Sequence, residues 1–460
     1  MVSEITKVKP VVIIKSGRTS SGQRAALSHT GSLAGADKVY DAAITKSGAI
    51  RANSVEDMLD ICKGLSLLPP AQGDRLAIIT NSGGPGVMSA DATEGSGLTL
   101  PEPSEQTKDK LREFLPGYAG FANPIDVTVE GTAEQYEKSA KVMLQDDYDL
   151  ALIIDIGTPY LKASPIAQGA LNAAQASGKP VACNFEVGED IPEAKALLDE
   201  HGAPAFSSAE RAVRALAKAA EYARLKKAEH YTPQTFAEKR LEIEAGRNAL
   251  LEYESMELLG SEGVSVPEHR FVARREELVQ AAHEIGYPLV LKVVSPQILH
   301  KSDFGGVKLN IGSDEQVLAA FDEIAAMAAD KDFRGVLLYP MLGKAAEMIV
   351  GFSRDAQFGP VVICGMGGIY TEILKDISLR IAPVSKEDAL EMLHELKTWP
   401  LLAGARGQTP ADVDGLAELI HKFSQLPFIY PQLKEGELNP VFVYQDRVEA
   451  ADARIILTEE

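Results

Sequence analysis

Residues 75–95 read RLAIITNSGGPGVMSADATEG, and they show the unit from which the first half of the chain is built. An apolar run of strand length ends at a glycine-rich turn, and a helix-like stretch of small residues follows. A similar unit begins at Pro10, and further apolar runs occur in YDLALIIDI and KPVACNF, with helical sequence between them. This alternation predicts parallel, doubly wound α/β layers as far as about residue 220.

The second half of the chain has a different pattern. Residues 221–250 are charged and lack apolar runs, so they predict an interdomain helix or linker with a boundary near residue 230. Helices are expected after Ser313 and Ser385, because each serine is followed at capping-box spacing by a residue that can complete the cap. The strands expected in this half predict an α+β domain with antiparallel pairs; they are YPLVLKVV, GGVKLNI, GVLLYPML, AEMIVGF and GPVVICGMGGIYTEIL.

Length and composition restrict the class of protein. A chain of 460 residues predicts roughly three domains, or two large ones. A net charge of -20 without a cluster of Lys and Arg argues against a nucleic-acid partner. No stretch approaches the ~18 apolar residues of a membrane helix, which argues against a membrane protein. Three widely separated cysteines form neither a disulfide framework nor a zinc motif, so a reduced, cytoplasmic setting is expected.

Two segments of the first half are candidates for binding or transferring an anion. His29 lies in the small-residue run SHTGS, where its imidazole would be reachable and largely neutral near pH 7, hence nucleophilic. The glycines Gly83, Gly84 and Gly86 stand between a strand and a helix N-terminus, where backbone amides can approach a phosphate. A packed or surface histidine and an ordinary tight turn are the alternative interpretations.

Two segments of the second half are candidates for a nucleotide site. The sequence LHKSDFGGV follows the strand that contains Lys292, and its Gly305-Gly306 pair could cover phosphates while Lys292 supplies a charge. An ordinary polar hairpin is the alternative. Near the C-terminus, Asn439 and Asp452 flank two expected strands and could meet as oxygen ligands for Mg²⁺ carried by a nucleotide.

Taken together, these segments resemble the NDP-forming acyl-CoA synthetase superfamily, specifically the ADP-forming acetate–CoA ligases, relatives of succinyl-CoA synthetase. The motifs that carry the resemblance occur in the family's order; they are KSGRTSSGQRAALSHTGSLAG, ITNSGGPGVMSAD, NPIDVT, LLEYESMELLGSEGVSVP, LKVVSPQILHKSDFGGV, GPVVICGMGGIYTE and ELNPVFV. The resemblance implies the C-terminal half of a succinyl-CoA synthetase-like ligase domain at 1–68, a flavodoxin-like ligase domain at 69–228 and an ATP-grasp domain at 229–460.

The resemblance also implies an activity. An ADP-forming acid–CoA ligase interconverts acyl-CoA, ADP and phosphate with a carboxylic acid, expected to be acetate, and with CoA and ATP. His29 would take the phosphoryl group from an acyl phosphate, and His300 would pass it on to ADP. The remaining roles implied by the family are nucleotide contacts from Lys292, Gly305, Gly306, Val307 and Glu347, Mg²⁺ ligands from Asn439 and Asp452, and stabilisation of phosphohistidine by Gly83, Gly84 and Gly86.

One departure from the family concerns CoA. Fused family members begin with a CoA-binding domain, whereas only a short segment precedes the strand that leads to His29 here. We therefore expect CoA to be bound by another domain or chain, and the chain to form oligomers. Two alternatives stay open: one chain of a split ligase, and a non-catalytic or regulatory ATP-binding remnant. A related protein lysine acetyltransferase has less support, because no length remains for its acetyltransferase domain.

Overall fold

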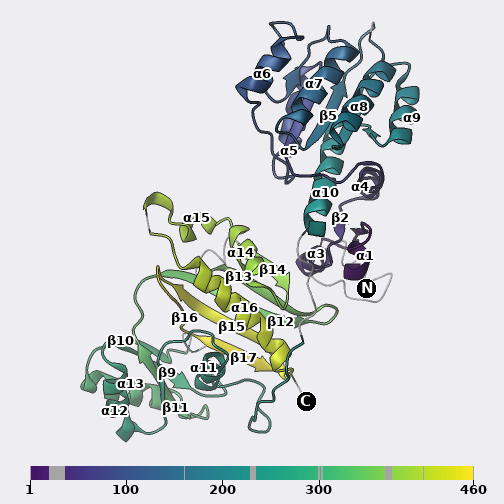
Figure 1. The fold of residues 1–460 in the computed structure, drawn as a ribbon. Helices are drawn as coiled ribbons and strands as arrows, with labels where there is room; N and C mark the ends of the chain where they lie inside the picture. The colour runs from purple at the N-terminus through teal and green to yellow at the C-terminus, as the bar shows by residue number, and fades with distance from the viewer. Residues whose placement is uncertain are drawn as a thin grey trace. The chain divides into compact units, whose positions relative to one another are not determined.

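The computed structural model describes residues 2–19, 37–159, 161–227, 235–298, 301, 304–367, 376–407 and 409–458. The chain divides into two compact units, one made of Met1–Ala34 with Ile44–Thr232 and the other of Gly35–Ala43 with Pro233–Glu460. Figure 1 colours the chain from purple at its N-terminus to yellow at its C-terminus. Within the described ranges, no helix has the length and apolar character needed to cross a membrane.

A five-stranded parallel sheet forms the centre of the first unit. Its strand order is β4-β3-β5-β6-β7, and helices connect successive strands over both faces, as the doubly wound prediction requires. The strands are β3 (Leu76–Thr80), β4 (Ile125–Asp126), β5 (Leu150–Asp155), β6 (Val181–Phe185) and β7 (Ala205–Phe206). A separate parallel pair consists of β1 (Val12–Ile14) and β2 (Ile50–Ala52).

The unbroken apolar run of β3 is explained by helices on both sides of the sheet. Ala77 and Ile79 pack in one core with α7 and α8, while Leu76 and Ile78 pack in the other with α10 (Figure 1). Because successive side chains of a strand point to opposite faces, a strand buried on both faces is apolar at most positions, and in β3 only the last residue, Thr80, is polar. The helices of the chain up to residue 227 are α1 (Val2–Thr6), α3 (Asp37–Lys46), α4 (Val55–Leu67), α5 (Gly83–Thr93), α6 (Glu105–Arg112), α7 (Ala133–Gln145), α8 (Ala163–Ser177), α9 (Ile191–His201) and α10 (Ala209–Lys227).

Two antiparallel sheets form the second unit, which confirms the α+β prediction. The smaller has the order β10-β9-β11-β8, and the larger has the order β14-β13-β12-β15-β16 with β17 also paired to β15. The strands are β8 (Arg270–Val272), β9 (Leu289–Val294), β10 (Val307–Ile311), β11 (Gly335–Pro340), β12 (Ala346–Asp355), β13 (Gly359–Met366), β14 (Ile377–Ile381), β15 (Leu433–Val443), β16 (Val448–Ala450) and β17 (Ala453–Leu457).

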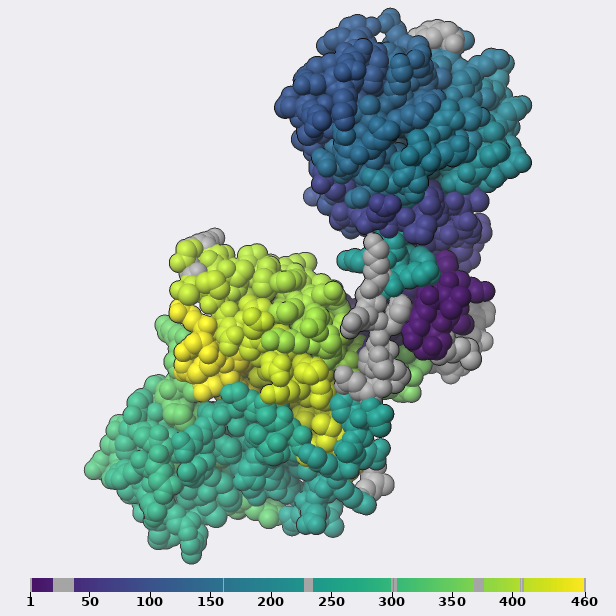
Figure 2. Space-filling model, in the orientation of Figure 1, coloured from purple at the N-terminus to yellow at the C-terminus, as the bar shows by residue number. Residues whose placement is uncertain are grey.

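Helices cover one face of each of these sheets. Leu291 and Val293 of β9 pack with α12 and α13, and the larger sheet packs with α11, α14 and α16. Figure 2 shows the C-terminal strands, in yellow, between the teal residues of the smaller sheet's region and the yellow-green residues that precede them in the chain. The helices of this unit are α11 (Glu252–Ser261), η1 (Arg275–Glu277), α12 (Leu278–Ile285), α13 (Asp314–Met327), α14 (Lys386–His394), α15 (Trp399–Leu402), η3 (Ala405–Gly407) and α16 (Val413–Ile429).

The two predicted helix starts differ in how their caps are completed. Ser385 and Asp388 form a full capping box at the start of α14, with each side chain accepting a hydrogen bond from the other's backbone N–H. Ser313 accepts from the backbone N–H of Gln316, but the Gln316 side chain accepts from Gly312, one residue outside the box. Both helices nevertheless begin where the sequence predicts.

Candidate functional site

Lys292 is a buried lysine on the face of β9 that turns away from α12 and α13. Its neighbours on that face are the apolar Val290 and Val294, and its side chain is 6% exposed. The ammonium donates to Oε1 of Glu252 at 2.8 Å, to Oδ2 of Asp452 at 2.7 Å and to the carbonyl oxygen of Ala451 at 3.3 Å. These contacts provide the compensation that a buried charge requires.

Three separate parts of the second unit bring these groups together. Glu252 is the first residue of α11, Lys292 is on β9, and Asp452 lies in the turn between β16 and β17. The Glu252 side chain is fully buried, whereas that of Asp452 is 28% exposed. The Tyr339 ring lies beneath the ammonium, 4.9 Å from Nζ to the ring centroid, and burial raises the pKa of this tyrosine to about 12.

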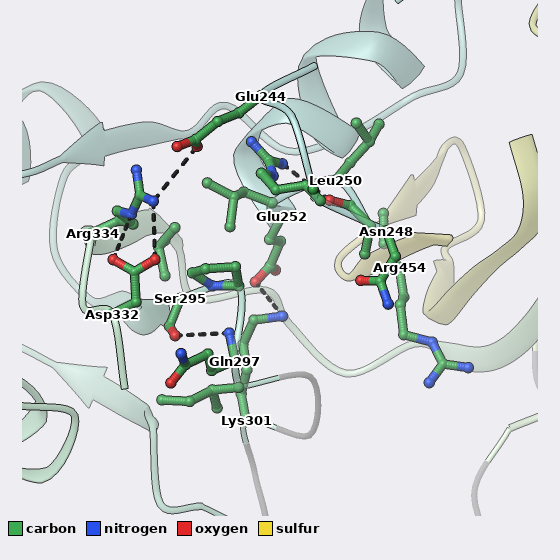
Figure 3. Close-up of a pocket in the computed structure, with 18 of the residues that line it drawn as sticks. Glu244, Asn248, Leu250, Glu252, Ser295, Gln297, Lys301, Asp332, Arg334 and Arg454 are labelled. Atoms are coloured by element: carbon green, nitrogen blue, oxygen red, sulfur yellow. Dashed lines mark hydrogen bonds and ion pairs between the residues drawn. The ribbon is translucent and has the colours of Figure 1, made fainter. Parts of the chain in front are cut away.

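Lys301 adds a second cation to this cluster. Its Nζ forms an ion pair with Oε2 of Glu252 at 2.9 Å and lies 3.9 Å from Oδ1 of Asp452. Figure 3 shows the carboxylate of Glu252 directed at this ammonium. Sequence reasoning missed Glu252 and Lys301; the available signal was the position of Lys301 next to His300 within the HKSDFGGV motif.

The four side chains form a mutually neutralised group, which we call the lysine–carboxylate cluster: Glu252, Lys292, Lys301 and Asp452. Burial alone would lower the pKa of Lys292, but the charges of Glu252 and Asp452 raise it well above its usual value. Burial alone would raise the pKa of Asp452, but the two lysines hold it below its usual range. The cluster therefore sets two lysine side chains against two carboxylates at close range.

The Gly305-Gly306 pair connects Lys301 to strand β9 through backbone hydrogen bonds. The Gly306 N–H donates to the carbonyl of Lys301, and the Val293 N–H donates to the carbonyl of Gly306, both at 2.8 Å. A Cβ on Gly306 would lie 2.5 Å from Cγ1 of Val293, so only glycine fits there. Gly305 adopts φ +76°, a left-handed conformation that favours glycine. Val307 follows directly and pairs across the sheet with Lys292.

Asn439 lies beside Asp452, as the two C-terminal strands predict. Its backbone N–H donates to the carbonyl of Asp452 at 3.2 Å, and its side-chain amide donates to Oε1 of Glu437 at 3.1 Å. Carboxylate and amide oxygens suit Mg²⁺, and two protein ligands suit an ion that keeps phosphate oxygens as its other ligands. The part of the chain that the structure describes holds no group of three His, Cys, Asp or Glu residues that could bind a metal by itself.

Two further features of the second unit concern a nucleotide site. Glu347 is exposed on β12 and pairs across the strands with Phe442, three positions from Asn439 along β15. A cavity of about 350 Å³ lies at the start of α11 and the end of β9. Its lining includes Glu252, Lys301, Ser295 and Arg454 (Figure 3).

A second candidate site lies at the end of β3 in the first unit. A cavity of about 470 Å³ lies there. The residues that line it are Asn81, Ser82, Gly83, Tyr118, Asp126, Thr128, Val129 and Glu130. Gly83 and Gly84 begin α5, and a Cβ at either would meet no atom within 4 Å. Their exposed amides suit an anion. Gly86 differs, because a Cβ there would lie 3.2 Å from the Thr80 side chain, so its small size serves packing.

The two predicted relay histidines, His29 and His300, lie outside the described residues. Their roles therefore stay predictions. The structure brings three sequence-predicted residues into one place: Lys292, Asn439 and Asp452. A fourth, Gly306, is connected to them because its N–H donates to the carbonyl of Lys301, whose side chain belongs to the cluster.

Three family models match the chain. They are an ATP-grasp domain over residues 242–457, a succinyl-CoA ligase like flavodoxin domain over residues 1–65 and a Ligase-CoA domain over residues 76–230. The flavodoxin description thus falls on the first segment, whereas the sequence interpretation gave it to 69–228. The limits 1–68, 69–228 and 229–460 stay predictions.

Curated relatives match over nearly the whole chain. An ADP-forming acetate–CoA ligase I of Archaeoglobus fulgidus is 38% identical over 99% of this chain and 67% of its own length. An ADP-forming acetate–CoA ligase of Methanocaldococcus jannaschii is 32% identical over 98% of this chain and 68% of its own length. The chain thus spans about two thirds of these relatives.

A shorter relative matches part of the chain only. The beta subunit of an ADP-forming acetate–CoA ligase I of Pyrococcus furiosus is 50% identical over 46% of this chain and 94% of its own length. The family models and the curated relatives indicate the same family, and the relatives match over nearly the whole chain. The chain belongs to the family of ADP-forming acetate–CoA ligases, which are enzymes.

Proposed function

We propose that the chain acts in an ADP-forming acid–CoA ligase as the part that carries the phosphoryl group and binds the nucleotide, with acetate as the acid. The observation that carries this proposal is the lysine–carboxylate cluster beside Asn439. Two ammonium groups on a rigid sheet suit phosphate oxygens, and Asp452 with Asn439 suits the metal ion that accompanies a nucleotide.

The reaction proceeds through phosphohistidine. Acyl-CoA and phosphate give an acyl phosphate and release CoA. A ring nitrogen of His29 attacks the phosphorus, the bond from phosphorus to the acyl oxygen breaks, and the carboxylic acid leaves. The phosphoryl group then passes to His300 and on to a terminal oxygen of ADP, which gives ATP. The family resemblance of the SHTGS and HKSDFGGV motifs supports these two roles.

The described residues have distinct tasks in this scheme. Contacts to the nucleotide would come from Lys292, Gly305, Gly306, Val307 and Glu347. Asn439 and Asp452 would hold Mg²⁺, which would supply positive charge beside the phosphates. The open amides of Gly83 and Gly84 at the start of α5 stabilise phosphohistidine. Gly86, the third predicted residue of this group, supports the turn by packing on Thr80.

CoA is bound by a further domain or chain. The beta-subunit relative supports this idea, because its whole length corresponds to about half of the present chain, so the family distributes its domains over one or two polypeptides. We place the enzyme in the cytoplasm and expect it to assemble with other chains. The three cysteines Cys62, Cys183 and Cys364 are unpaired, which suits a reducing compartment.

Titration calorimetry of the full chain with ADP, with and without Mg²⁺, tests the nucleotide site. We expect binding that needs Mg²⁺. Binding of neither ADP nor ATP at millimolar concentration would remove the proposed nucleotide site, and binding without phosphorylation would favour a regulatory ATP-binding protein.

Labelling with radioactive ATP tests the relay. The label is expected on His29, stable in base and labile in acid. His29→Ala should abolish the label, and His300→Ala should slow its appearance while the affinity for Mg-ADP stays the same. Label that persists in His29→Ala would show that the carrier has been assigned to the wrong residue.

A further inference from the structure

We propose that Glu252 is the positioning residue of the nucleotide site: it holds Lys292 and Lys301 in place while Asp452 exchanges these lysines for the metal ion of the incoming nucleotide. This inference rests on the proposed nucleotide binding. It assigns a role to a residue that lies in the segment LLEYESMELLGSEGVSVP and to which the sequence analysis gave none.

The difference in burial between the two carboxylates supports this division of tasks. Glu252 is fully buried at the start of α11, and both of its oxygens face ammonium groups, Lys292 at 2.8 Å and Lys301 at 2.9 Å. Asp452 has 28% of its side chain exposed, in a turn beside Asn439. Asp452 is therefore the more exposed of the two carboxylates, and the one whose oxygens can turn toward a ligand from solvent.

Counting the donors of Lys292 leads to the same conclusion. An ammonium has three N–H groups, and those of Lys292 are directed at Glu252, Asp452 and the carbonyl of Ala451. Lys292 can therefore contact a nucleotide phosphate only after it gives up one of these partners. Asp452 is the partner that can leave, because it has an alternative ligand in the metal ion.

Lys301 is in a different situation. Among the described residues, its one close partner is Glu252, because the 3.9 Å distance to Asp452 is too long for a hydrogen bond. Lys301 therefore has donors to offer a phosphate before any bond of the cluster breaks. We infer that a phosphate meets Lys301 first and that Lys292 is recruited when Asp452 leaves.

Glu252 keeps Lys292 and Lys301 close to each other during this exchange. Once Asp452 binds the metal ion, Glu252 is the remaining carboxylate between two ammonium groups that repel each other. Its backbone lies in the first turn of α11, where negative side chains are favoured by the helix dipole. Without the carboxylate, the lysines would separate and the phosphate would lose a paired binding surface.

The test compares Glu252→Gln with Glu254→Gln in the full chain. Glu254 is in the same helical turn, and its carboxylate pairs with Arg247 and not with the lysines, so it is a matched control. Calorimetry on folded protein should show Mg-ADP affinity reduced about tenfold or more in Glu252→Gln, and by less than about twofold in Glu254→Gln. Glu252→Asp, which keeps the charge, should restore part of the affinity.

A double-mutant cycle separates positioning from general support of the fold. In a Lys301→Met background, Glu252→Gln should weaken Mg-ADP binding less than it does in the wild-type protein, because one of the two cations it positions is gone. Equal effects in both backgrounds, or unchanged affinity in folded Glu252→Gln, would overturn the proposal.

Two further outcomes are decided by the same set of proteins. If Glu252→Gln does not fold, the double variant with Lys301→Met is measured against Lys301→Met alone, and equal affinities would overturn the positioning role. If the wild-type protein binds no Mg-ADP, the proposed function and this inference both fail. Wild-type binding together with unaffected Glu252→Gln rejects the inference alone.

Discussion

Nζ of Lys292 lies 2.7 Å from Oδ2 of Asp452, although 160 positions separate the two residues. This pair joins the smaller sheet to the C-terminal turn and brings the predicted metal ligand next to the predicted phosphate-binding lysine. Lys292 was expected at the site from its motif, and Asp452 from its place beside the two C-terminal strands. The structure shows in addition that these two side chains form an ion pair with each other.

Asp452→Asn should weaken Mg-ADP binding by about tenfold or more, because it replaces a charged metal ligand by a neutral one while side-chain volume is preserved. Titration calorimetry measures the effect. Asp446→Asn is the control, since Asp446 is an exposed aspartate in the turn between β15 and β16. Equal affinities of the two variants would contradict the role of Asp452.

Lys292→Met should destabilise the second unit by about 3–5 kcal/mol, because it leaves the buried Glu252 with one cation fewer. The chain has a single tryptophan, Trp399, which lies in the second unit, so its fluorescence during urea unfolding reports on that unit. Lys308→Met is the matched control: Lys308 is on the neighbouring strand and pairs with the exposed Glu323, which predicts a cost below about 1 kcal/mol.

Gly306→Ala should cost about 1–3 kcal/mol and reduce nucleotide affinity, because the new methyl group would overlap the Val293 side chain. The affected turn holds the carbonyl of Lys301. Gly343→Ala provides the comparison, since a Cβ at Gly343 meets no atom within 4 Å. If both variants unfold at the same urea concentration and bind Mg-ADP equally, the close approach at Gly306 has no consequence.

The buried Asp376 should make the second unit acid-sensitive. Burial raises its pKa, but hydrogen bonds from the Thr398 hydroxyl and from the backbone N–H groups of Lys397 and Thr398 outweigh this and lower it. A group with a lowered folded-state pKa stabilises the fold above its unfolded pKa, near 3.9, and this contribution is lost as pH falls through the folded value.

We therefore expect Asp376→Asn to be less stable than wild type at pH 7 and the difference to shrink as the pH falls below about 4. Urea unfolding followed by Trp399 fluorescence at several pH values measures it, because Trp399 adjoins Thr398. A difference that stays constant from pH 7 to pH 3 would show that the Asp376 hydrogen bonds do not depend on its charge.

The alternation of strands and helices and the glycine turns made the fold of the first unit predictable. The apolar run of β3 could be interpreted because a strand covered on both faces is apolar at nearly every position. The charged segment before residue 250 was less informative: residues 235–248 form no helix, and Leu241 instead hydrogen bonds to Gln432 in both directions. Composition alone could not distinguish a helix from such a docked segment.

The candidate site was predictable only in part. Lys292 stands in a quoted motif and Asp452 was expected from its place beside the C-terminal strands, but Glu252 is one of several glutamates in its segment and nothing in the spacing distinguishes it. Its significance comes from two lysines 40 and 49 positions later in the sequence, which the fold places on either side of it. This pairing depends on tertiary structure and cannot be predicted from the spacing of the residues along the chain.

The neutrality of the lysine–carboxylate cluster also affects how a ligand finds the protein. A chain of net charge -20 whose phosphate site has no surplus positive charge repels an anionic metal–nucleotide complex at long range and favours it only at contact. Added salt screens that repulsion. The association rate should therefore stay level or rise with ionic strength, as stopped-flow measurements can show, so that encounter is governed by diffusion and fit instead of electrostatic steering.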